Sequence, residues 1–251
     1  KVPPMRRRPF IVAGAIAAAL ALVLPAGADA LTLSTLADGT LRMNAPEGAL
    51  DEVGVRFGGT PLAGDTPETD TIEIAVYSSA PIVDQAGCTA VSAAIVRCPR
   101  PSGFDIDLGA GNDSLAVDLV VRRASTGQWP YAPTIPIGPI TVRDGGGNDF
   151  LTFKTVSDVT VVNGPGDDNV VADQAPAIRV IAGPGADRFK AENTFFTRLT
   201  VDYSAYDRPV SVTQDFVDDD GAAGEHDAVF DAYSVIGGSG NDTLQSYPYS
   251  F

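Results

Sequence analysis

Residues 140–153 read ITVRDGGGNDFLTF, residues 159–172 read VTVVNGPGDDNVVA, and residues 178–191 read IRVIAGPGADRFKA. In each stretch, apolar and polar residues alternate on both sides of a glycine-rich turn that ends in aspartate. The three stretches start 19 residues apart. Alternation with period two is typical of β-strands, and a fixed period of this size is typical of proteins built from stacked repeats.

The turn pattern, glycine-x-glycine-x-aspartate, occurs five times in the chain, and its flanks keep one phase. Counted from the first glycine, apolar residues stand five and three residues before it, and another stands two residues after the aspartate. These apolar residues are Phe104, Ile106 and Leu115; Ile140, Val142 and Leu151; Val159, Val161 and Val170; Ile178, Val180 and Phe189; and Tyr233, Val235 and Leu244. A strand–turn–strand unit repeated in this way predicts columns of apolar side chains stacked inside the fold.

These patterns predict an all-β fold, namely a parallel β-roll or β-helix solenoid with coils of about 19 residues. The section before the first copy lacks glycine clusters but contains strand patterns at residues 53–57 and 72–76. We expect residues 31–103 to form an irregular β section that caps the fold. Residues 104–251 would then form the solenoid.

The turn residues are of the kind that binds hard cations. They are Gly109, Gly111 and Asp113; Gly145, Gly147 and Asp149; Gly164, Gly166 and Asp168; Gly183, Gly185 and Asp187; and Gly238, Gly240 and Asp242. Paired glycines let the backbone turn and approach a ligand closely, and the aspartate adds a carboxylate. Carbonyl and carboxylate oxygens without imidazole or thiolate are the ligands that Ca²⁺ prefers. The repeated pattern therefore predicts calcium sites, whereas a single copy would be typical of an ordinary turn.

Stacking would bring the turns of successive coils together, so that one ion is shared by two aspartates. Asp149 with Asp168, and Asp168 with Asp187, are such pairs. Without the ion these carboxylates would repel each other across a short gap. Asp113 and Asp242 lack a copy of the pattern in the adjacent coil, so we expect less complete sites there.

Residues 237–245, GGSGNDTLQ, follow the nonapeptide GGxGxDxUx, a calcium-binding β-helix repeat. The chain resembles the secreted hemolysin-type (RTX) calcium-binding proteins, and more narrowly the members with signal peptides from high-GC Gram-positive bacteria. In that subgroup a cysteine-containing β segment precedes the first cluster, and Tyr-Ser, Pro-Val-x-Val, Asp-Gly and Gly-Glu-x-Asp precede the last. The matching residues are Cys88 and Cys98, Tyr203-Ser204, Pro209-Val210-Ser211-Val212, Asp220-Gly221 and Gly224-Glu225-His226-Asp227. The resemblance covers residues 85–245 and implies a parallel β-roll or β-helix that binds Ca²⁺ through glycine and aspartate.

The chain departs from the RTX pattern in two respects. Its repeats recur every 19 residues rather than in nonapeptides, so only one side of each coil would carry metal turns. In four copies the first glycine of the doublet is replaced, by Leu108, Asp144, Asn163 and Ala182. We therefore expect fewer and weaker sites than in a full β-roll.

Residues 1–30 have the features of a secretory signal peptide. A basic start at residues 5–8 precedes an apolar stretch of 15 residues at 10–24, and residues 28–30 fit a signal peptidase site. Residues 1–4 stand upstream of the expected start at Met5. Fifteen residues are few for a membrane span, which favours cleavage after Ala30 over a retained anchor. We expect a secreted protein without a membrane span after cleavage.

The chain ends at Phe251, soon after its last repeat. A stack of repeats needs a cap over its last apolar layer and its open strand edge, and residues 247–251 are a thin one. We expect either that further repeats follow in the natural protein or that the chain is a truncated gene product.

The chain is acidic, with 17 Lys and Arg against 32 Asp and Glu. Loss of residues 1–30 would remove four basic residues and one acidic residue, leaving 13 against 31 and a net charge of −18. This balance argues against nucleic acid and anionic membranes as partners and favours cations, although it also suits a plain solubilising surface. Cys88 and Cys98 are the only cysteines, and in an oxidising compartment we expect a disulfide rather than metal ligation by two thiols.

Catalytic motifs are scarce in the sequence. It contains no His-Glu-x-x-His and no Gly-x-Ser-x-Gly, and its only histidine, His226, lies in the acidic stretch 218–227. We expect that stretch to be solvated rather than a further cation site. We therefore expect a non-enzymatic calcium-binding protein with a structural, adhesive or export-related role. A cell-surface or polysaccharide partner would contact a loop such as residues 129–131.

The alternative is a parallel β-helix enzyme that acts on polysaccharide. Such an enzyme would work as a calcium-assisted lyase, in which the ion neutralises a uronate and a basic side chain removes a proton. The candidate bases are Lys154, Arg188 and Lys190, which follow the predicted metal turns.

Overall fold

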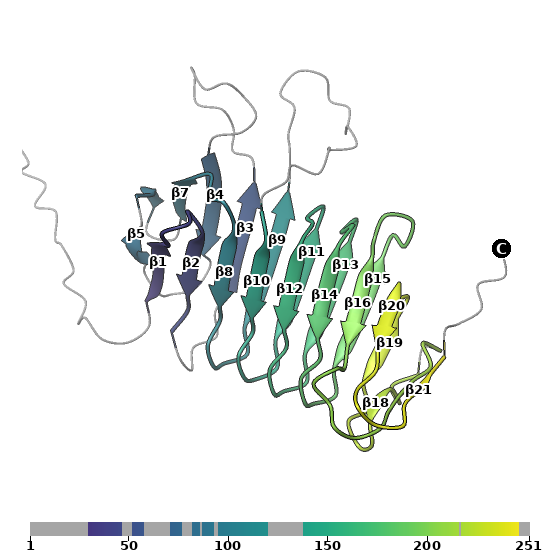
Figure 1. Cartoon of the computed structure of the whole chain (residues 1–251). Coiled ribbons are helices and arrows are strands. Elements are labelled where there is room, and N and C mark those ends of the chain that lie inside the picture. The colour runs from purple at the N-terminus through teal and green to yellow at the C-terminus, as the bar shows by residue number, and fades with distance from the viewer. Residues whose placement is uncertain are drawn as a thin grey trace, which may run out of the picture.

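The computed structural model of the chain describes residues 30–46, 52–57, 71–76, 82–85, 87–92, 95–119, 138–215 and 217–245. The expected signal peptide up to residue 29, the loop at 129–131 and the end at 247–251 lie outside these ranges. Within them every regular element is a β-strand (Figure 1), so the prediction of an all-β protein is confirmed. None of the described residues forms a helix that is long and apolar enough to cross a membrane.

The strands form two nine-stranded sheets and one small sheet. In spatial order, sheet A contains β20 (Ser234–Ile236), β16 (Leu199–Asp202), β14 (Ile178–Ile181), β12 (Val159–Val162), β10 (Ile140–Arg143), β8 (Phe104–Asp107), β2 (Leu41–Asn44), β1 (Leu31–Thr35) and β5 (Ile82–Gln85). Sheet B contains β19 (Ala228–Phe230), β15 (Arg188–Glu192), β13 (Asn169–Asp173), β11 (Phe150–Lys154), β9 (Ser114–Leu119), β3 (Glu52–Phe57), β4 (Thr71–Val76), β7 (Ile95–Pro99) and β6 (Thr89–Ser92). The third sheet, sheet C, contains β18 (Gly221–Ala222), β17 (Val210–Val212) and β21 (Thr243–Leu244).

From β8 to β16 the chain alternates between sheets A and B, and each repeat consists of a sheet A strand, a glycine turn and a sheet B strand. In Figure 1 the two sheets lie one behind the other, and the glycine turns that join them run along the lower edge of the view. Equivalent strands pair in parallel, so that Ile140 lies opposite Val159, and Leu151 lies opposite Val170. The 19-residue period therefore appears as hydrogen-bond register. The finer prediction of a solenoid stays a prediction.

The core lies between the two sheets, because alternate residues of each strand point inward. Ile140 and Val142 are buried on β10, whereas Thr141 between them is partly exposed. The inward positions stack in columns across repeats, as the apolar pattern predicted. One column of sheet A contains Phe104, Ile140, Val159, Ile178 and Leu199, and one column of sheet B contains Leu115, Leu151, Val170, Phe189 and Val229.

The prediction was wrong for the last copy of the pattern. Tyr233 and Leu244 are exposed rather than stacked in the core, with 65% and 46% of their surface accessible. In sheet A the column of buried side chains ends at Leu199 on β16, and Tyr233 precedes the next strand, β20. Leu244 lies outside sheet B, because β21 pairs with β17 in sheet C.

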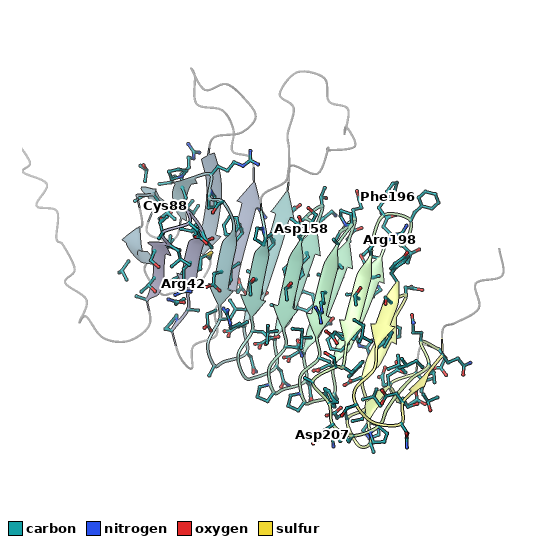
Figure 2. The ribbon with its side chains drawn as sticks, in the orientation of Figure 1. Arg42, Cys88, Asp158, Phe196, Arg198 and Asp207 are labelled. Atoms are coloured by element: carbon teal, nitrogen blue, oxygen red, sulfur yellow. A yellow bond between two sulfur atoms is a disulfide. The ribbon has the colours of Figure 1, made fainter. Side chains whose placement is uncertain are left out.

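The N-terminal section continues both sheets. β2 pairs in parallel with β8, and β3 pairs in parallel with β9, so that both sheets cross the boundary expected at residue 103. Further out, β1 pairs with β2 and β3 pairs with β4 in antiparallel fashion, whereas β1 pairs with β5 in parallel. Cys88 and Cys98 form a disulfide at this end (Figure 2), with 4.1 Å between their Cα atoms, so the predicted pairing is present.

The glycine turns stack too closely for side chains. A Cβ atom on Gly145 would lie 1.4 Å from the carbonyl oxygen of Gly109, and one on Gly164 would lie 1.5 Å from that of Gly145. Gly145 also has a φ of 93°, which side chains rarely allow. The middle residue of that turn, Gly146, has its nearest atom at 3.6 Å and no such φ. The spacing of the glycines thus follows from contact between successive turns.

This contact predicts different effects for two neighbouring substitutions. Gly145→Ala should destabilise the fold by about 2 kcal/mol or more, because it combines a steric overlap with an unfavourable φ. Gly146→Ala, as the control, should change stability by less than about 0.5 kcal/mol. Urea unfolding followed by far-UV circular dichroism measures both variants. Equal losses would contradict the close stacking.

Candidate metal centre

The aspartates of four glycine turns lie in a single buried column, which we call the aspartate ladder. Asp113, Asp149, Asp168 and Asp187 are each at most 3% exposed. Each backbone N–H of these four aspartates is donated to the carboxylate of the aspartate in the following repeat. The bonds join Asp113 N–H to Asp149 Oδ1 (2.7 Å), Asp149 N–H to Asp168 Oδ1 (2.8 Å), Asp168 N–H to Asp187 Oδ1 (3.0 Å) and Asp187 N–H to Asp227 Oδ1 (2.9 Å).

The last rung of the ladder is Asp227, which the glycine pattern did not identify. Between β16 and β19 the chain replaces the short turn with a longer excursion that contains β17 and β18. Asp227 then leads into β19 as Asp187 leads into β15. A signal was present in the sequence, because Val229 stands two residues after Asp227 at the apolar position that follows every predicted aspartate.

Asp242 is the aspartate of the best match to the nonapeptide, but it lies outside the ladder. It precedes β21, and its Oδ1 accepts the N–H of Val210 in sheet C at 3.0 Å. The structure therefore brings Asp113, Asp149, Asp168 and Asp187 together and leaves Asp242 apart from them.

A second inward column faces the ladder across each glycine turn, and we call it the facing column. It consists of the residues directly after β8, β10, β12, β14 and β16, namely Leu108, Asp144, Asn163, Ala182 and Tyr203, all of which are buried. Three of these five side chains are polar. Each repeat thus presents one ladder aspartate and one variable side chain to the interior near its turn.

Asp144, Asp149 and Asp168 form the group best suited to a cation among the described residues. Each offers a carboxylate oxygen, and these oxygens lie within 4.8 Å of one another. Oδ1 of Asp144 accepts the N–H of Gly164 at 2.6 Å, and Oδ1 of the other two accepts ladder N–H groups. Oδ2 of Asp144 and Oδ2 of Asp149 are buried and accept no hydrogen bond from the described part of the chain.

Burial makes these carboxylates reluctant to ionise. It raises the pKa of Asp144 to about 8, with the nearby Asp168 carboxylate adding to the shift. Burial likewise raises the pKa of Asp168 to about 6, that of Asp187 to about 9 and that of Asp227 to about 7, against hydrogen bonds from the ladder that lower each value. A buried carboxylate without a counter-charge is costly, so the interior favours a cation or a proton at these oxygens.

The outer side of each turn carries a second, exposed ladder. Oδ1 of Asn112 accepts the N–H of Asn148 at 2.8 Å, and Oδ1 of Asn148 accepts the N–H of Asp167 at 3.0 Å. In these bonds the N–H donor belongs to the following repeat, whereas in the inner ladder it belongs to the preceding repeat. Turn carbonyls also bind between repeats, because Pro165 O accepts the N–H of Gly147 and Gly146 O accepts that of Gly111. The stacked turns are thus joined on both sides.

The acidic stretch 218–227 is only partly solvated, so the expectation for it was wrong at three residues. Asp220, Glu225 and Asp227 are buried. Both oxygens of each have partners, including the N–H of Val229 for Asp220 and the guanidinium of Arg208 for Glu225. These residues hold β17 and β18 against the last repeats, whereas His226, between Glu225 and Asp227, is exposed.

The three basic residues considered for a lyase lie on strands of sheet B, and each pairs with an acidic side chain. Lys154 pairs with Asp173 at 3.2 Å, and Lys190 pairs with Glu192 at 2.8 Å. Arg188 pairs with Asp218 at 3.1 Å and lies over the ring of Phe230. All three side chains are exposed by about half of their surface, 45–54%.

Comparison with known proteins gave no relative. No family model matches the chain, and neither the curated proteins nor the solved structures contain a match.

The raised pKa values predict how stability depends on pH in the absence of metal. A carboxyl whose folded pKa exceeds its unfolded value near 3.9 stabilises the fold when protonated, and this contribution is lost as pH rises through the folded pKa. With EDTA present, the free energy of unfolding should therefore fall from about pH 5 to about pH 9. Asp105 and Asp202 have lowered pKa values and stay ionised over this window. Denaturant midpoints that stay level or rise would contradict the prediction.

Tyr203 provides a test of whether protein donors to the second oxygen of a ladder carboxylate stabilise the fold. Its hydroxyl donates to Oδ2 of Asp227 at 2.8 Å, and both side chains are fully buried. Tyr203→Phe should cost about 1–3 kcal/mol, because it leaves a buried carboxylate oxygen without a donor. Tyr233→Phe is the control, since Tyr233 is exposed and its contact with the Arg198 guanidinium needs only the ring. Thermal or urea unfolding compares the two, and equal stabilities would refute the assigned role.

Proposed function

We propose that the protein is a secreted calcium-binding β-solenoid whose ion is held inside the stack of glycine turns. Its role would be structural, adhesive or export-related rather than enzymatic. The observation that carries the proposal is the group formed by Asp144, Asp149 and Asp168, with two buried Oδ2 atoms that accept no hydrogen bond from the described residues. Three carboxylates without imidazole or thiolate suit Ca²⁺, which takes six to eight oxygens in flexible geometry.

Several observations support the solenoid within this proposal. Strands of sheets A and B alternate along the chain, and each repeat adds one parallel strand to each sheet. Both sheets keep their register over consecutive repeats, and the glycine turns stack in contact on one edge. The resemblance of the turns to RTX repeats points the same way.

Secretion is supported by the basic and apolar character of residues 1–30 and by the disulfide between Cys88 and Cys98. Millimolar calcium is available outside cells, and extracellular calcium modules bind with Kd values of about 10⁻⁴ to 10⁻³ M. An ion bound only by the folded chain would add about 2.7 kcal/mol of stability when free calcium is a hundred times Kd.

A calcium titration of the EDTA-treated chain tests the proposal. Calorimetry should give saturable binding of Ca²⁺ that Mg²⁺ does not reproduce, because Mg²⁺ demands a smaller octahedral site. Binding should also raise the midpoint of thermal unfolding at neutral pH. No heat of binding, with stability independent of calcium, would mean that protons satisfy the buried carboxylates and that the turns are purely structural.

The substitution Asp144→Asn should separate ion binding from folding. It removes one ligand oxygen charge, so calcium binding should weaken by about tenfold or more. Stability without calcium should stay level or rise, because the amide carries no charge and can donate to a neighbouring carboxylate. Asp242→Asn is the matched control, since Asp242 lies outside the ladder and should leave the affinity unchanged. Equal losses of affinity in both variants would argue against this site.

A further inference from the structure

The facing column changes its chemistry from one repeat to the next while the ladder stays aspartate. After Asp144 the next two residues of the column are Asn163 and Ala182. The space between successive ladder carboxylates is therefore lined differently in each repeat. This difference determines where an ion has room and where a protein group already occupies its place.

Asn163 bridges two carboxylates of the ladder. Its side chain is 6% exposed, and its Nδ2 lies 2.9 Å from Oδ2 of Asp168 and 3.0 Å from Oδ2 of Asp187. An amide carries two N–H donors, so one Asn can serve both carboxylates, as a shared cation would. Asp187 Oδ1 accepts the N–H of Asp168, so both oxygens of Asp187 have protein donors. Both oxygens of Asp168 also have donors, but Asp168 lies beside Asp144 and Asp149, whose Oδ2 atoms accept no hydrogen bond from the described residues.

The other repeats have protein groups in the same place or no polar group at all. Tyr203 donates its hydroxyl to Oδ2 of Asp227. Leu108 and Ala182 supply no polar atom to the interior. Among the described repeats, Asp144 alone adds a carboxylate to a ladder pair, and there Oδ2 of Asp144 and Oδ2 of Asp149 accept no hydrogen bond from the described residues.

We propose that the chain holds one inner calcium ion, at Asp144, Asp149 and Asp168, and that the Asn163 carboxamide replaces a second ion between Asp168 and Asp187. This inference rests on the proposed function for the first site. It follows that calcium joins the repeat that begins at β10 to the repeat that begins at β12. From there to β19, hydrogen bonds from protein groups join successive repeats. The stability of the stack would thus depend on calcium between the repeats of Asp149 and Asp168, and not between those of Asp168 and Asp187.

The substitution Asn163→Asp tests the inference directly. It replaces the bridging amide with a carboxylate and recreates, one repeat along, the set of three carboxylates found at Asp144. Calcium chloride titration of the full EDTA-treated chain by calorimetry should give one ion for the wild type and two for Asn163→Asp. Without calcium the variant should be less stable than the wild type, because an added buried charge replaces two donated hydrogen bonds.

Asp187→Asn provides a second test that does not depend on the folding of the first variant. Asp187 is not a ligand in this scheme, so Asp187→Asn should still bind one ion, with Kd within about twofold of the wild type. Asp149→Asn should weaken binding by about tenfold or more. Loss of calcium binding in Asp187→Asn would overturn the inference, as would two or more ions in the wild type.

Two further outcomes separate this inference from the proposed function. If the wild type binds no calcium but Asn163→Asp binds one ion, the role of Asn163 stands and the proposed function fails. If neither binds calcium while both are folded by far-UV circular dichroism, both proposals fail. One ion in each chain would leave the proposed function intact and overturn the role of Asn163.

Discussion

The hydrogen bond from each ladder N–H to the carboxylate of the next repeat is the contact on which the rest of this structure depends. It requires the aspartate to point inward, because only there does its carboxylate reach the backbone of the neighbouring repeat. It also brings successive turns so close that Gly145 and Gly164 have no space for a Cβ atom. Glycine spacing, parallel register and the buried acidic column are therefore consequences of one arrangement. Apolar columns between the sheets then supply most of the burial.

The cost of this arrangement is a row of carboxylates in a poorly solvated interior. Ladder N–H groups use only one oxygen of each carboxylate, and the second oxygen needs a donor, a proton or a cation. The protein supplies donors in two places, the amide of Asn163 and the hydroxyl of Tyr203. At Asp144 it instead adds another carboxylate. The facing column is thus the variable element of the fold, and it is where binding and stability are connected.

The excursion between β16 and β19 illustrates how the stack tolerates a long insertion. Three of its acidic side chains are buried. Asp220 accepts a backbone N–H, Glu225 binds the guanidinium of Arg208, and Asp227 completes the ladder. Sheet C then holds β21 beside β17 and takes the last glycine turn away from the column. In Figure 2 this region includes Asp207, while Asp158 and Phe196 lie at the opposite edge, where sheet B strands return to sheet A. The two edges of the sheets therefore differ in chemistry.

The sequence alone determined the strands of the repeats, the 19-residue register, the glycine turns and the proximity of aspartates in successive turns, because these depend on local alternation and on the repetition of one unit. The burial of these aspartates came only from the structure. The sequence also identified Cys88 and Cys98 as a pair. Only the tertiary structure decided that Asp227, not Asp242, completes the ladder, because pairing across an insertion depends on which strand reaches the free edge of sheet B. Only the fold gathered Asp144, Asp149 and Asp168 around one space and set Asn163 between two carboxylates. Those relations join different repeats, and residue spacing along the chain does not encode what fills the space between them.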